Sequence, residues 1–119
     1  MKLSIVSFFM VILFSSSLFA GDFKIYSEKT EMTYAQTLEY CLEDGDDWTI
    51  PNKALLARVI VVGDLQDIDR WFWSSTKAPS ELCSDEVCYY QVHTKTLSER
   101  VRSEKELGHG ICVYYETLK

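Results

Sequence analysis

Four cysteines and two histidines are the side chains of this chain that could do the most specific chemistry. Thiolates and imidazoles are the usual ligands of zinc, and several of these residues have spacings that would allow a zinc site. The possible ligands are Cys83, Cys88, His93, His109 and Cys112. In a short chain that reaches an oxidising compartment, an even number of cysteines favours disulfides instead. We therefore expect disulfides and free histidines, with His109 in a turn between two glycines, and no metal or other cofactor.

The four cysteines allow three disulfide pairings. Cys83 and Cys88 are close in the sequence, so a bridge between them would close a short loop at the start of a strand. Cys41 and Cys112 would then join the first half of the chain to its last strand. Such a long closure is worth about 4 kcal/mol and the short one about 2 kcal/mol.

An acidic run at one turn is the second group with ligand chemistry. Glu43, Asp44, Asp46 and Asp47 place several carboxylates close together, and Ca²⁺ is bound by oxygens of this kind. The run lacks the alternating order of a calcium-binding loop, and Gly45 in its middle is typical of a helix end. We interpret the run as a solvated turn.

Signals for nucleophilic catalysis are weak in this sequence. Ser74 and Ser75 lie outside any G-x-S-x-G turn, and neither histidine has an evident partner in the sequence. We expect the serine hydroxyls to bond backbone groups at the end of a strand. The sequence therefore favours a protein that is not an enzyme.

The chain begins with a pattern typical of a secretory signal peptide. Lys2 is followed by an uncharged run from Leu3 to Phe14, then by serines and the small residue Ala20. This order predicts residues 1–20 as a signal peptide, 21–119 as a single exported domain, and a periplasmic or extracellular location. Leu18, three residues before the predicted cut, is bulkier than the ideal small residue. An uncleaved N-terminal membrane anchor is therefore the alternative.

The charge balance limits the kinds of partner. The chain has 18 acidic and 12 basic side chains, a formal net charge of −6. An acidic domain repels phosphate backbones, which argues against nucleic acid as a partner. The same charge would suit a basic protein. Contact with a membrane is expected only through an uncleaved signal anchor.

The expected elements begin with a short strand over Phe23–Tyr26 and a helix that starts after Thr33. Thr33 and Gln36 form a capping-box pattern, and Gly45 is placed to end the helix. The helical face expected to pack inward consists of Tyr34, Leu38, Cys41 and Leu42. This orientation would direct Cys41 into the interior.

A second helix and a run of strands follow. Pro51 keeps the chain extended, Asn52 caps a helix from Lys53 to about Val62, and Gly63 ends it. Four strands are expected over residues 71–75, 88–94, 100–103 and 111–115. Two helices followed by antiparallel strands predict an α+β fold.

The tryptophans and one strand face supply the candidates for binding. Trp48, Trp71 and Trp73 could stack against sugar rings, but we expect Trp48 and one of the others in the core. Alternation predicts Cys88, Tyr90 and Val92 on one side of a strand. The surface candidates are Tyr89, Gln91 and His93 on the other side, with Lys95, Arg100 and Arg102 nearby. These basic residues could receive an anion or could protect a strand edge against aggregation.

Several of these motifs, in this order, resemble the bacterial Lcl C-terminal domain family, also known as DUF1566. The matching features are the helix from Ala35 to Cys41, "DDWTIPN", "WFWSST", the strand from Tyr90 to Val92, and "GICVY". The resemblance covers roughly residues 33–115. It implies a C-type-lectin-like fold, with two helices packed on short antiparallel sheets and two disulfides. It also implies a bridge between the first helix and the last strand, which favours Cys41–Cys112.

The sequence departs from the family pattern at three positions. Thr49 stands where the family usually has Arg, Leu55 where Glu is common, and Ile111 where Arg precedes the last cysteine. The long loop with which true lectins bind calcium also has no counterpart, because only about a dozen residues separate "WSST" from "CYY". We expect neither calcium nor a ligand network at these positions.

Together these observations predict an exported binding module that does no chemistry and recognises a protein or a glycan at the bacterial envelope or cell surface. The alternative is a small acidic periplasmic inhibitor of a basic secreted enzyme, such as a cell-wall hydrolase, held by charge complementarity.

Overall fold

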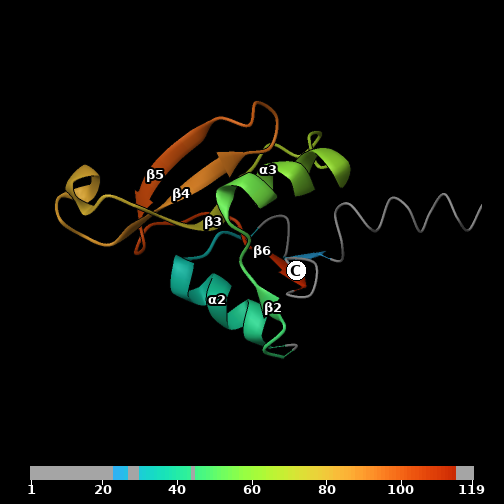
Figure 1. Ribbon diagram of the computed structural model, residues 1–119, viewed down its shortest axis with the longest axis horizontal. Helices are drawn as coiled ribbons and strands as arrows, with labels where there is room; N and C mark the ends of the chain where they lie inside the picture. The colour runs from blue at the N-terminus through green and yellow to red at the C-terminus, as the bar shows by residue number, and fades with distance from the viewer. Residues whose placement is uncertain (1–22, 27–29, 44, 115–119) are drawn as a thin grey trace, which may run out of the picture.

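The computed structural model describes residues 23–26, 30–43 and 45–114, which form an α+β fold (Figure 1). The predicted signal peptide lies outside the described residues. Two helices, α2 and α3, accompany two three-stranded antiparallel sheets. Within the described part of the chain, no helix has the length and apolar character needed to cross a membrane.

The first sheet brings the two ends of the described chain together. Its strands are β1 (Phe23–Ile25), β6 (Ile111–Tyr114) and β2 (Trp48–Thr49), in the order β1-β6-β2. β6 is the central strand and pairs antiparallel with both neighbours. Non-local pairing of this kind ties the early and late parts of the chain into one unit.

The second sheet has the order β3-β4-β5, and β5 forms its outer edge in Figure 1. Its strands are β3 (Trp71–Ala78), β4 (Cys88–His93) and β5 (Glu99–Ser103). β3 is longer than predicted because a shift in register between Trp73 and Lys77 carries the strand past its polar residues. Within this irregular stretch the Ser74 hydroxyl donates to the Tyr90 carbonyl and accepts from the Thr76 N–H. The Ser74 hydroxyl therefore bonds backbone groups as expected, but Ser74 lies within β3 and not at its end.

The helix α2 (Tyr34–Leu42) begins as predicted but packs with a different face. Thr33 and Gln36 form the reciprocal capping box. Its fully buried residues are Thr37 and Cys41, whereas Leu38 and Leu42 are 39% and 47% exposed. Leu38 and Leu42 were therefore wrongly predicted to face inward. The side of the helix that packs on the protein runs through the partly buried Tyr34 and the buried Thr37 and Cys41. The helix also ends at Leu42, and Gly45 forms the following turn with φ of 119°.

The helix α3 (Lys53–Val62) matches its prediction at both ends. The Asn52 side chain accepts from the Leu55 N–H at 2.8 Å, and Gly63 is the C-terminal cap. α3 packs on β3 and β4. The main core then joins the helix to residues from both sheets: Leu56, Val59, Ile60, Leu65, Phe72, Val92, Ile111 and Val113.

A second apolar cluster surrounds the disulfide between Cys41 and Cys112, which the structure contains as predicted. Ile50 and Trp73 complete its buried part. Trp73 is fully buried, so one tryptophan is in the core as expected. Trp48 is only half-buried at the edge of this cluster, which corrects its placement in the core.

The second predicted disulfide is not formed in this structure. Cys83 ends the 3-10 helix η1 (Ser80–Cys83), Cys88 begins β4, and both are free thiols. The Cys88 thiol donates to the Pro79 carbonyl at 3.5 Å, and Cys83 lies close enough to Cys88 for the two thiols to interact. Desolvation, followed by the contact with Cys88, raises the pKa of Cys83 to about 11.

Candidate binding surface

Strand pairing places the predicted surface residues on one face of the sheet β3-β4-β5. Residues directly opposite on neighbouring strands project to the same side. Trp71 lies opposite His93, Gln91 opposite Arg100, and Tyr89 opposite Arg102. We call this surface the aromatic–basic face and define it by Trp71, Tyr89, Gln91, His93, Arg100 and Arg102. Phe72 and Val92 project to the other side, where they join the core under α3.

Arg100 is the most firmly positioned cation of this face. The carbon at the centre of its guanidinium lies 4.3 Å from the Trp71 ring centroid, a cation–π contact. Its Nε donates to Gln91 Oε1 at 2.8 Å. The side chain of Arg100 therefore reaches from β5 across β4 to β3, and its planar group has a defined orientation.

Gln91 is a buried positioning residue, which corrects its prediction as an exposed ligand-binding residue. Its side chain is fully buried, and Nε2 donates to the Leu107 carbonyl at 3.2 Å. Gly108 covers it so closely that a Cβ at that position would lie 2.2 Å from Gln91 Nε2. Alternation along β4 could place Gln91 on this face, but only the tertiary structure brings the segment 107–108 over it.

The arginines of the aromatic–basic face have no acidic partner at ion-pair distance among the described residues. In this part of the chain an ion pair joins Lys53 to Glu99, and a hydrogen bond joins His93 to Asp69. Partial burial lowers the pKa of Arg100, and repulsion from Arg102 lowers it further, whereas the more distant Glu106 and Glu31 oppose the shift. The face is therefore locally cationic in an acidic protein.

Tyr89 is covered by the N-terminal end of α2. The Tyr34 and Tyr89 rings stack with centroids 3.7 Å apart and planes only 3° from parallel. Tyr34 also contacts Trp73 edge-on, with centroids 5.6 Å apart. Burial, followed by the interaction with Tyr89, raises the pKa of Tyr34 to about 12. Tyr89 therefore joins the sheet to α2, and the open part of the face lies nearer Trp71 and Arg100.

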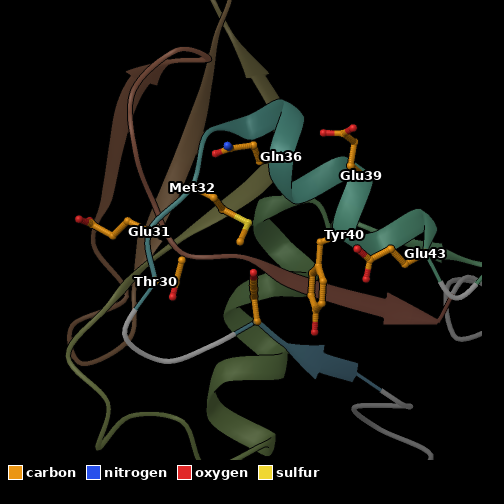
Figure 2. A pocket seen from close by; sticks show the side chains of 8 residues that line it. Thr30, Glu31, Met32, Gln36, Glu39, Tyr40 and Glu43 are labelled. Atoms are coloured by element: carbon orange, nitrogen blue, oxygen red, sulfur yellow. The ribbon is translucent and has the colours of Figure 1, made fainter.

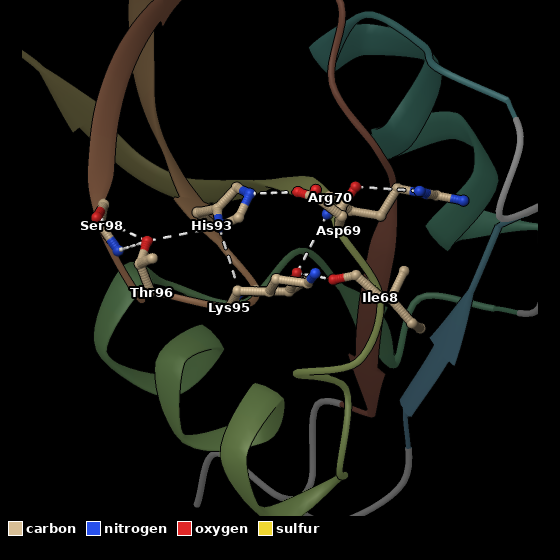
Figure 3. Close-up of polar contacts among 8 residues, drawn as sticks. Ile68, Asp69, Arg70, His93, Lys95, Thr96 and Ser98 are labelled. Carbon is tan, nitrogen blue, oxygen red and sulfur yellow. Dashed lines mark hydrogen bonds and ion pairs between the residues drawn. The ribbon is translucent and has the colours of Figure 1, made fainter.

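His93 is held at the end of β4 by contacts that Figure 3 shows. Its Nε2 lies 2.7 Å from Asp69 Oδ1, and its Nδ1 accepts from the Lys95 N–H at 3.3 Å. The neutral form with its proton on Nε2 satisfies both bonds. The His93 ring also contacts Trp71 edge-on, with centroids 4.9 Å apart.

Lys95 lies away from the face, in the turn between β4 and β5. Its side chain is exposed, and its carbonyl accepts from Gln66 Nε2 at 3.5 Å. The adjacent Thr94 is fully buried, and its hydroxyl donates to the Ile68 carbonyl. The structure thus places Trp71 beside the residues that were predicted to bind a ligand, and it places Lys95 away from them. The sequence signal for placing Trp71 on this face was its spacing of two residues from Trp73, since residues two apart on a strand project to the same side.

Away from the aromatic–basic face, a shallow pocket of about 400 Å³ lies beside α2, as Figure 2 shows. We call it the acidic pocket; its lining residues are Tyr26, Thr30, Glu31, Met32, Gln36, Glu39, Tyr40 and Glu43. Tyr26 and Tyr40 stack with centroids 4.8 Å apart. Glu31, Glu39 and Glu43 form no ion pair with any described residue.

The residues considered for metal binding are dispersed. Within the described ranges, no group of three His, Cys, Asp or Glu side chains has the geometry to hold a metal ion. Asp44 lies outside those ranges, and Cys112 is bonded to Cys41. His109 is not a turn residue as predicted, because it forms a parallel bridge with Phe72. Burial lowers the pKa of His109, and repulsion from Arg70 adds to the shift.

No protein-family model matches this chain, and no curated protein matches it either. The resemblance to the Lcl C-terminal domain family therefore rests on the motifs described above and stays a prediction. The fold and the two surfaces are the remaining guide to function.

Proposed function

We propose that this chain is an exported, non-catalytic binding module that recognises a protein or glycan at the bacterial envelope or cell surface. The observation that carries the proposal is Arg100, a partly buried cation oriented by Trp71 and Gln91 and without an ion-pair partner among the described residues. Holding a charged side chain in one geometry has an entropic cost. An oriented donor group on an open face is suited to a ligand that completes its hydrogen bonds.

A C-type-lectin-like fold is part of the same proposal. It is supported by two helices on small antiparallel sheets, by the pairing of β1 with β6, and by the bridge from α2 to β6. We further propose that Cys83 and Cys88 form the second disulfide once the protein is in an oxidising compartment. The interaction between the two thiols supports this pairing, since it requires the two residues to be neighbours in the fold.

Binding measurements with purified envelope components test the proposed function. The full-length protein is immobilised and exposed to soluble envelope polysaccharides and to envelope proteins, with binding followed by interferometry. Trp71→Leu removes aromatic surface from the face, and Val61→Ala on the exposed side of α3 is the matched control. We expect binding that Trp71→Leu weakens and Val61→Ala leaves unchanged. Absence of binding to every component, or equal effects of the two variants, would contradict the proposal.

The acidic pocket favours a second candidate function, inhibition of a basic secreted enzyme. Three carboxylates around two stacked tyrosines could receive a lysine or arginine side chain of such an enzyme. The test is a lysozyme inhibition assay with the wild-type protein, Glu39→Gln and the remote control Glu81→Gln. Inhibition that only Glu39→Gln weakens would support this function. No inhibition at micromolar protein would exclude lysozyme-type enzymes as the target.

A further inference from the structure

The guanidinium of Arg100 has donors that the described protein does not use. Its Nε is bonded to Gln91, and its plane is covered on one side by Trp71. Its terminal nitrogens have no hydrogen-bond acceptor among the described residues. A partly desolvated cation with open donors is stabilised when an anion accepts from them.

The support beneath Arg100 is rigid. Gln91 is fully buried and anchored to the Leu107 carbonyl, and Gly108 closes over it without room for a side chain. The oxygen that orients Arg100 therefore cannot turn away without breaking a buried hydrogen bond. A site supported in this way loses little conformational entropy when it binds a ligand.

A second cation lies on the same face of the same strand. Arg102 is two residues beyond Arg100 on β5 and opposite Tyr89 on β4. Like Arg100, it forms no ion pair with a described acidic residue. The repulsion between the two arginines has a larger effect on the pKa of Arg100 than the attraction of either Glu106 or Glu31. An anion bound between the two guanidinium groups would relieve this repulsion.

We propose that Arg100 and Arg102 form an anion-binding site whose ligand is the carboxylate of an acidic sugar. This inference rests on the proposed function and specifies its ligand. The flat fork of a guanidinium matches the two oxygens of a carboxylate. The protein as a whole carries a charge of −6, which disfavours densely charged polyanions and favours a ligand with widely spaced charges.

The surroundings of the site suit a sugar better than a protein surface. The centre of a protein interface usually combines aromatic and arginine anchors with several apolar side chains. Apart from Leu107, the large exposed apolar side chains lie elsewhere: Leu38 and Leu42 on α2, Val61 and Val62 on α3, Leu82 in η1, and Val87 before β4. Beside Arg100 the face instead presents the partly exposed Trp71, whose ring can contact the C–H groups of a pyranose.

The proposal is tested by titrating the full-length protein with uronic-acid oligosaccharides and with their methyl esters, followed by NMR shifts of the tryptophan indoles and by calorimetry. Methylation removes the charge of the ligand without altering the protein. We expect the acid to bind at least about tenfold more tightly than the ester, as a charge-assisted pair implies. Equal affinities, or no binding of the acid, would overturn the proposal.

Protein variants locate the site. Arg100→Gln and Arg102→Gln should each weaken binding of the uronic acid by about tenfold and leave binding of the ester unchanged. Arg58→Gln, which removes the same charge from the exposed side of α3, is the control and should change neither affinity. If all three variants weaken binding of the acid equally, binding depends only on the net charge of the protein, and the proposed site is wrong.

A third set of ligands separates this inference from the proposed function. Acidic peptides carry the same carboxylate without a sugar ring, so tighter binding of peptides than of uronic acids would overturn the glycan assignment. A neutral glycan or an envelope protein that binds with sensitivity to Trp71→Leu, but not to Arg100→Gln, would also overturn it. In both cases the protein would still be a binding module. Failure of every envelope component to bind would contradict the proposed function itself.

Discussion

Cys41 on α2 and Cys112 on β6 are joined by a disulfide that links residues 71 positions apart in the sequence. Their Cα atoms are 5.5 Å apart, and both residues are fully buried. The bridge lies in the second apolar cluster with Trp73, the tryptophan whose ring supports Tyr34. The disulfide therefore joins α2 covalently to β6, the central strand of one sheet. Through Trp73, the same cluster supports Tyr34, which covers Tyr89 on the other sheet.

Removing this bridge should be the most damaging change among the cysteines. The double variant Cys41→Ser/Cys112→Ser should lose about 4 kcal/mol of unfolding free energy, a large part of the roughly 5–15 kcal/mol typical of a domain. Urea denaturation followed by tryptophan fluorescence measures the loss. Cys88→Ser is the comparison and should cost less. The opposite ranking would show that the long bridge does not dominate stability.

The two tryptophans beside the bridge should differ in their contribution. Trp73 is fully buried, and its Nε1 donates to the Met32 carbonyl at 2.9 Å. Trp73→Ala should therefore cost about 3–5 kcal/mol, because it opens a large cavity. The Met32 carbonyl also accepts from the Gly108 N–H at 2.9 Å, so it keeps one partner in the variant. Trp48→Ala, at a half-buried position, should cost less. Equal losses in urea denaturation would show that Trp48 is as central as Trp73.

Tyr34 should make stability fall at alkaline pH. Its pKa rises from 10.0 to about 12 in the folded protein. The unfolded chain therefore releases this proton first, and the contribution is complete below pH 10 and is lost between about pH 10 and 12. Denaturant midpoints for wild type and Tyr34→Phe should converge across this window, since phenylalanine has no ionising hydroxyl. A constant difference between the two proteins would contradict the shift.

The reduced Cys83 thiol should react slowly with an alkylating agent, and the Cys83–Cys88 pair should become a disulfide only where a disulfide-bearing oxidant accepts the two electrons. A pKa of about 11 keeps the Cys83 thiol protonated at pH 8, so alkylation of the reduced protein should be slow. Non-reducing peptide mass spectrometry of the protein recovered from the cell envelope should find Cys83–Cys88 together with Cys41–Cys112. The Cys41–Cys112 bridge is the internal control, because its presence shows that the sample was oxidised. Free Cys83 and Cys88 beside an intact Cys41–Cys112 would rule out the two-disulfide form.

Local sequence signals predicted the helices because their physical causes are local. The capping box of Thr33 and Gln36, the Asn52 cap and the Gly63 end each depend on atoms within a few residues. The inward face of α2 was harder to predict. Leu38 and Leu42 are apolar but lie off the buried stripe, and hydrophobicity along a short helix does not show which side a distant strand will cover.

For the candidate site, too, local sequence patterns predicted one part and the tertiary structure decided the other. Alternation along β4 was enough to place Tyr89 and Gln91 on one face, because side chains of a strand project to opposite sides in turn. The register between β4 and β5 then places Arg100 and Arg102 on that face. The tertiary structure alone decided what covers each residue. Gln91 is buried by the segment 107–108, and Tyr89 is stacked under Tyr34. These contacts join residues far apart in the chain, so no periodicity encodes them, and they leave Arg100 as the oriented cation of the open surface.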